Sequence, residues 1–219
     1  KQSVYRGAAI YRNESTDGGA SFGPDIKLAD HSCECCRIAL APEPGGSLAA
    51  MWRHVFEPNE RDHAFALLGS GPSGTERATQ DHWAVDGCPH HGPGLIPARS
   101  GGYHAVWFGV RDGVSAVRYG RLDTAGRAVG EVRPLPDTRA EHADLAGSGD
   151  ALAIVWRSFD GQATVLRAWL SRDAGRSFRL RDLGRTEDDN DHPRVLVHQG
   201  RMFAVWRTRK EIRIEPLDP

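Results

Sequence analysis

The chain has 219 residues, and 28 Lys and Arg residues nearly balance 29 Asp and Glu residues, leaving a formal net charge of -1. Nucleic-acid or anionic-membrane partners favour an excess of positive charge, so neither is expected, and no apolar run is long enough to span a bilayer. The length suits a single domain over residues 1–219. Its 25 Gly and 13 Pro residues separate short apolar clusters, which is typical of an all-β protein with many short strands.

A short β-rich phrase that ends in Trp occurs four times along the chain. The tryptophans are Trp52, Trp107, Trp156 and Trp206, separated by 55, 49 and 50 residues. In three of the four periods a Gly-rich turn and another β-rich run precede the phrase, which indicates a hairpin. Such a period suits one blade of a propeller. The sequence therefore predicts a β-propeller of four-stranded antiparallel blades, with about four to five blades in this chain.

Two segments share the pattern Ser-x-Asp-x-Gly-x-x-Phe, and an incomplete match to it surrounds Asp123 and Gly126. The matching residues are Ser15, Asp17, Gly19 and Phe22 in the first segment and Ser171, Asp173, Gly175 and Phe178 in the second. An Asp that bonds backbone amides and a Gly with positive φ form a turn, here expected between outer strands. The pattern resembles the Asp box (BNR repeat) of sialidase-like propellers. That resemblance implies a structural marker rather than a catalytic site, and a six-bladed parent whose N-terminal blades are absent here.

Cysteines and histidines recur at equal distances before the tryptophans. Cys33 and Cys88 each lie 19 residues before their Trp, and the next two pairs lie 17 and 16 residues before it. Two later histidines each lie 14 residues before theirs. Because inner strands of a propeller run around one channel, these positions are expected to meet at one rim. The predicted set is Cys33, Cys35, Cys36, Cys88, His90, His91, His142 and His192.

Thiolate and imidazole ligands together favour copper or zinc, and the absence of a carboxylate-rich set argues against calcium and magnesium. With up to four sulfurs, copper is the first choice and zinc the second. The alternative for the cysteines is a disulfide between Cys33 and Cys88, with the histidines lining a wet channel. The main interpretation is a secreted or periplasmic propeller that binds copper at the mouth of its channel, for sequestration or redox use.

Two other functions remain open from the sequence, and activity as an enzyme is left undecided, with the balance against it. Resemblance to sialidases implies a glycosidase in which Arg37 and Arg194, in Arg-Ile-Ala and Arg-Val-Leu contexts, hold a substrate carboxylate. Both lack the Pro of the sialidase Arg-Ile-Pro motif, and no third arginine or activated Tyr is found, so no sialoside hydrolysis is expected. The second alternative is a protein-binding propeller with a disulfide-stabilised rim, whose protein partner is not identified.

Overall fold

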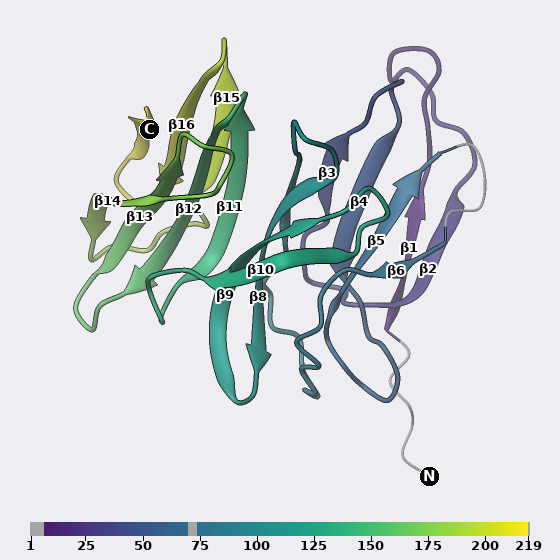
Figure 1. Ribbon diagram of the computed structural model, residues 1–219, viewed down its shortest axis with the longest axis horizontal. Helices are drawn as coiled ribbons and strands as arrows, with labels where there is room; N and C mark the ends of the chain where they lie inside the picture. The colour runs from purple at the N-terminus through teal and green to yellow at the C-terminus, as the bar shows by residue number, and fades with distance from the viewer. Residues whose placement is uncertain (1–6, 70–73, 219) are drawn as a thin grey trace.

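A computed structural model describes residues 7–69 and 74–218, and the strands found there form five antiparallel sheets. The sheets lie in chain order, with the β1–β2 sheet at one side and the later blades at the other (Figure 1). The first sheet contains β1 (Ala8–Arg12) and β2 (Ile26–Ser32). Blade I contains β3 (Ala39–Pro42), β4 (Leu48–Arg53), β5 (His63–Leu68) and β6 (Glu76–Arg77). Blade II contains β7 (Gly94–Pro97), β8 (Tyr103–Arg111), β9 (Val114–Leu122) and β10 (Ala128–Pro134).

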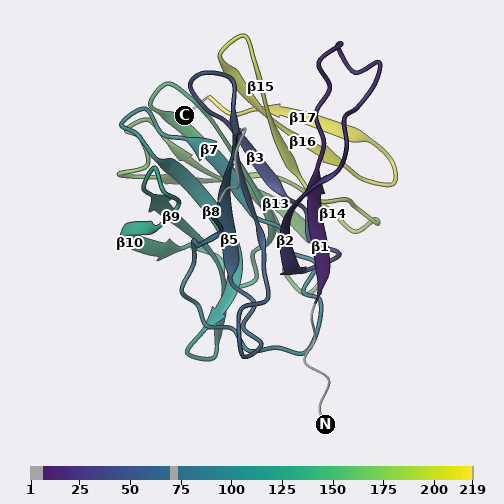
Figure 2. The ribbon, with the colours of Figure 1, turned by 90° about the vertical axis from the view of Figure 1, so that its right-hand side faces the viewer.

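Blade III contains β11 (Glu141–Ser148), β12 (Ala151–Phe159), β13 (Thr164–Ser171) and β14 (Arg179–Thr186), and blade IV contains β15 (Arg194–His198), β16 (Arg201–Arg207) and β17 (Ile212–Pro216). The first strand of each blade is the inner one: β7 contacts β3 and β11, and β11 contacts β15. Figure 2 shows β3 and β7 next to each other near the middle of the molecule. The predicted all-β propeller of antiparallel blades is confirmed. The described residues contain no helix of the length and apolarity that crossing a membrane requires.

The four repeated tryptophans form equivalent parts of the core. Each lies on the second strand of its blade and is at most 1% exposed. Three of their indole N–H groups also bond the segment that leads into the same blade. Trp107 and Trp156 donate to the carboxylates of Asp81 and Asp137 at 2.8 and 2.9 Å, and Trp206 donates to a backbone oxygen. In blades II, III and IV the repeated Trp therefore ties the blade to the connection that precedes it.

The Asp-box segments form turns between strands, and their hydrogen bonds are local. Asp173 accepts the amide of Ser177 at 2.9 Å, in the turn between β13 and β14, and Asp17 accepts that of Ser21 at 3.0 Å between β1 and β2. Hydrogen bonds from these serines hold the pKa of both carboxyls well below the usual range. Asp123 accepts the amide four residues later in the same way. These bonds give the turns a structural role.

Candidate functional site at the inner rim

We give the name inner rim to residues 31–37, 88–93, 141–144 and 190–194, which lie before or at the start of the inner strands. Arg37, just before β3, extends past blade II to blade III. Its guanidinium donates to the backbone oxygen of Pro93 at 3.0 Å and to that of Ala143, and its Nη2 lies 3.3 Å from Oδ1 of Asp144. Gly92 makes this path available, because an added Cβ there would lie 2.1 Å from Cγ of Arg37. The sequence thus leaves a gap in blade II for an arginine of blade I.

Asp144 joins three blades at this point. Its Oδ2 accepts the backbone amide of Val195 at 3.0 Å, and its Oδ1 lies 3.9 Å from Nη1 of Arg194. Arg37 and Arg194, far apart in sequence, therefore share one carboxylate, which is largely shielded from solvent. Two guanidinium groups around one carboxylate leave positive charge and donors available for an anionic ligand.

A pocket of about 390 Å³ opens beside Arg194. Arg157 donates to the backbone and side-chain oxygens of Asn190 at 2.7 and 3.0 Å, and its Nε lies 3.5 Å from Oε1 of Glu141. The pocket is lined by Arg157, Asn190, Asp191, His192 and Arg194. Such a lining of charged and amide groups fits a polar ligand that carries negative charge.

Histidines from blades II, III and IV form a stack of rings next to the pocket. The ring centroids of His91 and His142 are 4.3 Å apart and those of His142 and His192 are 3.4 Å apart, with the planes within 9° of parallel. Burial, followed by neighbouring positive charge, lowers the pKa of His91 to about 4 and that of His142 to about 3, and burial also lowers the pKa of His192. The stack is therefore neutral near pH 7, so the positive charge of the rim comes from its arginines.

The four cysteines gather where blades I and II meet. Cys35 and Cys88 form a disulfide, whereas Cys33 and Cys36 are buried free thiols. The Cys33 sulfur lies 3.1 Å from that of Cys36 and 3.2 Å from that of Cys88. A hydrogen bond from Cys36 lowers the pKa of Cys33 to about 6.

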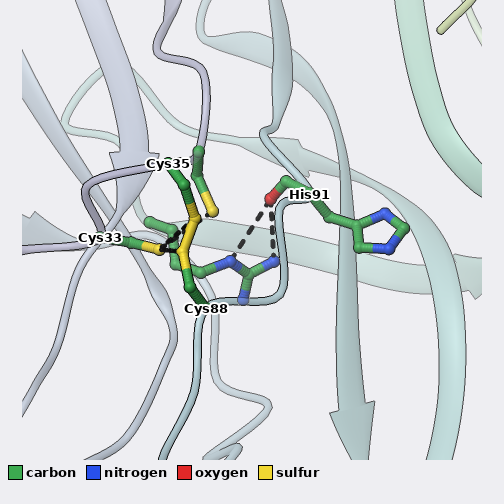
Figure 3. The surroundings of a disulfide bond; sticks show 6 residues. Cys33, Cys35, Cys88 and His91 are labelled. Atoms are coloured by element: carbon green, nitrogen blue, oxygen red, sulfur yellow. Dashed lines mark hydrogen bonds between the residues drawn. A yellow bond between two sulfur atoms is a disulfide. The ribbon is translucent and has the colours of Figure 1, made fainter. Parts of the chain in front are cut away.

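Arg53 connects the sulfur cluster to the rim. Its fully buried guanidinium interacts with the thiols and donates to the backbone oxygens of Arg61, Phe108 and His91. Figure 3 shows the backbone oxygen of His91 held in this way while the His91 ring points away from Cys33, Cys35 and Cys88. The sulfurs and the imidazoles therefore belong to two separate groups.

Seven of the eight Cys and His residues predicted to meet at the rim lie there in two groups, four cysteines in one and three histidines in the other. The structure brings the four cysteines together and stacks three of the histidines, but His90 is exposed and belongs to neither group. The predicted disulfide alternative had the wrong partner, since Cys88 is joined to Cys35 rather than to Cys33. With Cys35 and Cys88 joined in a disulfide, only two of the four cysteines can be thiolates, so the cluster does not fit an ion bound by four thiolates. Binding of copper or zinc by the reduced chain stays a prediction.

Sequence reasoning found Arg37 and Arg194 but missed the groups between them. The missed residues are Asp144, Glu141 and Arg157. A usable signal existed for Asp144, because it lies between Ala143 and Leu145, which are both buried, and an Asp in such a place is unusual unless it is paired. The fold and this rim together define a β-propeller with a polar, arginine-containing site where its inner strands begin.

No family model matches this chain, and no curated protein matches its sequence. Among solved structures it is similar to an α-L-arabinofuranosidase from Clostridium thermocellum, with 13% identity, a TM-score of 0.50, and coverage of 95% of this chain and 74% of that one. Others are an exo-1,5-α-L-arabinanase from a bovine ruminal metagenomic library, 13% identical with a TM-score of 0.47 over 96% and 87% of the chains, and an endo-arabinase from Bacteroides thetaiotaomicron, 13% identical with a TM-score of 0.48 over 95% and 84%. At this identity the shared feature is the fold.

These findings correct the main functional interpretation. The predicted function as a copper-binding propeller is contradicted, because the solved structure that is similar to this chain at a TM-score of 0.50 is described as an α-L-arabinofuranosidase. The resemblance to sialidase-like propellers is supported at the level of the β-propeller fold.

Proposed function

We propose that this β-propeller is a glycoside hydrolase that acts on a sugar bearing a carboxylate, such as a sialoside or a uronide. The observation that carries the proposal is the convergence of Arg37 and Arg194, from blades I and IV, on Asp144. A guanidinium group binds a carboxylate through two parallel hydrogen bonds, and a second guanidinium adds further donors and charge. The similar structure from Clostridium thermocellum is described as an α-L-arabinofuranosidase, but activity follows the site rather than the fold, and this rim offers positive charge.

Most glycoside hydrolases also use two carboxyl groups, one on either side of the bond that breaks. Glu141 and Asp191 take these roles in the proposal. Asp191 lines the pocket, and Glu141 contacts Arg157 on the pocket wall. Asp144 is engaged by Val195 and both rim arginines, so its part is to orient those arginines toward the ligand. The neutral histidine stack supplies a flat face beside them.

The test is a set of fluorogenic 4-methylumbelliferyl glycosides: an N-acetylneuraminide, a glucuronide and a neutral arabinofuranoside. We expect cleavage of one anionic substrate and none of the arabinofuranoside. Arg37→Ala and Arg194→Ala should each lower kcat/KM for that substrate by about 10- to 100-fold, the worth of a charged hydrogen bond. Arg185→Ala is the matched control, since Arg185 pairs with Asp160 away from the rim and should leave kcat/KM unchanged.

Equal cleavage of the arabinofuranoside in the wild type and both rim variants would contradict the choice of an anionic sugar. Absence of turnover, together with no calorimetric binding of N-acetylneuraminate or glucuronate, would contradict the whole proposal.

A further inference from the structure

The disulfide and the two free thiols of the sulfur cluster lie in reacting distance of one another. The Cys33 sulfur is 3.2 Å from the Cys88 sulfur of the disulfide and 3.1 Å from the sulfur of Cys36. Cys33 and Cys36 are buried, whereas Cys35 and Cys88 are exposed. A structural crosslink needs no thiol pair beside it, and the glycoside site described above uses none of the four sulfurs.

We propose that these cysteines form a thiol–disulfide exchange site that moves the crosslink from the exposed Cys35–Cys88 pair to the buried Cys33–Cys36 pair. In the first step the Cys33 thiolate attacks the Cys88 sulfur, the Cys33–Cys88 bond forms, and the Cys35–Cys88 bond breaks with Cys35 leaving as a thiolate. In the second step the Cys36 thiol, whose pKa is raised by its hydrogen bond to Cys33 and by burial, gives its proton to the Cys35 thiolate and attacks the Cys33 sulfur, so the Cys33–Cys36 bond forms and the Cys33–Cys88 bond breaks with Cys88 leaving as a thiolate. One disulfide and two thiols are present before and after, so no oxidant or reductant is consumed.

The surroundings of the cluster favour this chemistry. The buried guanidinium of Arg53 interacts with both Cys33 and Cys36, and Arg61 adds positive charge near Cys33. Positive charge stabilises the thiolates that attack and leave. The product presents two exposed thiols, Cys35 and Cys88, at the surface. These can attack the disulfide of an external partner, so the class of substrate is an accessible disulfide of a small molecule or a protein.

Exchange also changes how the blades are joined. The Cys35–Cys88 bond links the rim segments of blades I and II, whereas a Cys33–Cys36 bond lies within the segment before β3. Transfer of the crosslink therefore releases the covalent tie on the segment that carries His91. The exchange requires no ligand in the pocket, so it stands independently of the glycosidase proposal.

The test traps the product in the folded protein. The native wild type, without added reductant, is incubated with iodoacetamide, and the disulfides and alkylated cysteines are mapped by mass spectrometry. We expect uptake of two carbamidomethyl groups, on Cys35 and Cys88, together with a Cys33–Cys36 disulfide. Cys33→Ser should retain the Cys35–Cys88 bond and take up no label on either of these residues. Cys36→Ser should stop at the Cys33–Cys88 disulfide, with label on Cys35.

The two variants give different patterns, so the test survives if one of them fails to fold by tryptophan fluorescence. A wild type that keeps Cys35–Cys88 intact and unlabelled while it stays folded would overturn the proposal. Purified protein with four thiolates, no disulfide and one equivalent of zinc or copper would overturn it as well.

Discussion

Gly92 shows how a residue with no reactive group can determine the site. Its φ lies outside the left-handed region, so the backbone itself does not require glycine. The requirement comes from the crossing of Arg37, whose Cγ, backbone oxygen and backbone nitrogen would lie 2.1, 2.7 and 2.8 Å from an added Cβ. Backbone atoms cannot move aside as the end of a flexible side chain can, so any larger residue must displace the arginine that spans three blades.

Gly92→Ala should therefore act on the ligand site more than on the fold. We expect kcat/KM for the anionic glycoside to fall at least about 10-fold, because Arg37 loses its alignment with Asp144. Gly87→Ala is the control in the same connection, since an added Cβ there has its nearest neighbour at an ordinary 3.8 Å, and it should leave kcat/KM unchanged. Equal kcat/KM in the two variants, in steady-state assays, would show that Arg37 does not bind the substrate.

The histidine stack predicts a loss of stability in acid. The pKa values of His91 and His142 lie at about 4 and about 3 in the folded chain, below the ordinary 6.5. Between these values the unfolded chain binds more protons than the folded one, so the free energy of unfolding decreases as pH falls from about 6.5 toward 4. After allowance for partial solvent screening, each histidine accounts for on the order of 1–2 kcal/mol.

His142→Asn tests this dependence, and Asn is chosen because it tolerates the positive φ of 52° at this position. Urea denaturation at pH 7.5 and pH 4.5 should show a loss of unfolding free energy that is about 1–2 kcal/mol smaller in the variant than in the wild type. Carboxylates that titrate in acid are common to both proteins and cancel in the comparison. An identical loss in both would mean that the buried imidazole is not the source.

Single residues mark the limit of what the sequence predicts. Equal spacing before the tryptophans locates the cysteines, because residues at equal positions in neighbouring blades meet at the rim. It does not locate the partner of Arg37, because that side chain passes over the neighbouring blade to reach Asp144 in the next one. Nor does it separate Cys88 from His91, which lie three residues apart but face different groups (Figure 3).

At the scale of elements, the turns are predictable because their hydrogen bonds join residues at most four positions apart. Packing between elements adds a contact that the motif alone does not indicate. The turn at Gly175, between β13 and β14, lies on Tyr119 of β9 in the preceding blade. A similar contact occurs one blade earlier, where Gly126 lies against Phe65 of β5. The outer turns therefore join neighbouring blades.

Gly175→Ala should destabilise the chain through two effects, whereas Gly149→Ala should show only one. Both glycines have positive φ, 80° and 63°, which costs an alanine about 1 kcal/mol. An added Cβ at Gly175 would also lie 2.0 Å from Oη of the buried Tyr119, which His104 holds at 2.7 Å, whereas nothing lies within 4 Å at Gly149. We expect Gly175→Ala to lower the free energy of unfolding by about 1–3 kcal/mol more than Gly149→Ala, measured by urea denaturation. Equal losses of unfolding free energy in the two variants would show that the Gly175 turn does not pack tightly against Tyr119 of blade II.

At the scale of the whole molecule, the fold is predictable because one pattern is repeated. Each period supplies a buried Trp on a second strand, and the structure places all four tryptophans there. The β1–β2 sheet contains no such Trp. The spacing of the tryptophans alone therefore predicts four blades and does not predict the first sheet. The sequence does not predict the hydrogen bonds that three of the tryptophans make with the connections before their blades. Asp81 and Asp137, which accept two of these bonds, lie at different distances before their Trp, so no repeated spacing marks them.

Trp52, the repeated tryptophan whose indole N–H makes no such hydrogen bond within the described part of the chain, provides an internal control for the free energy that these bonds contribute. Trp156 donates to Asp137 at 2.9 Å, whereas Nε1 of Trp52, equally buried, has no hydrogen-bond partner within residues 7–69 and 74–218. Replacement by Phe removes similar volume from both cores but deprives only Asp137 of a donor. Trp156→Phe should therefore lower the free energy of unfolding by about 1–3 kcal/mol more than Trp52→Phe, in urea denaturation followed by circular dichroism. If the two variants lose the same free energy, the repeated Trp stabilises its blade by packing alone, and the bond to the connecting segment contributes nothing measurable.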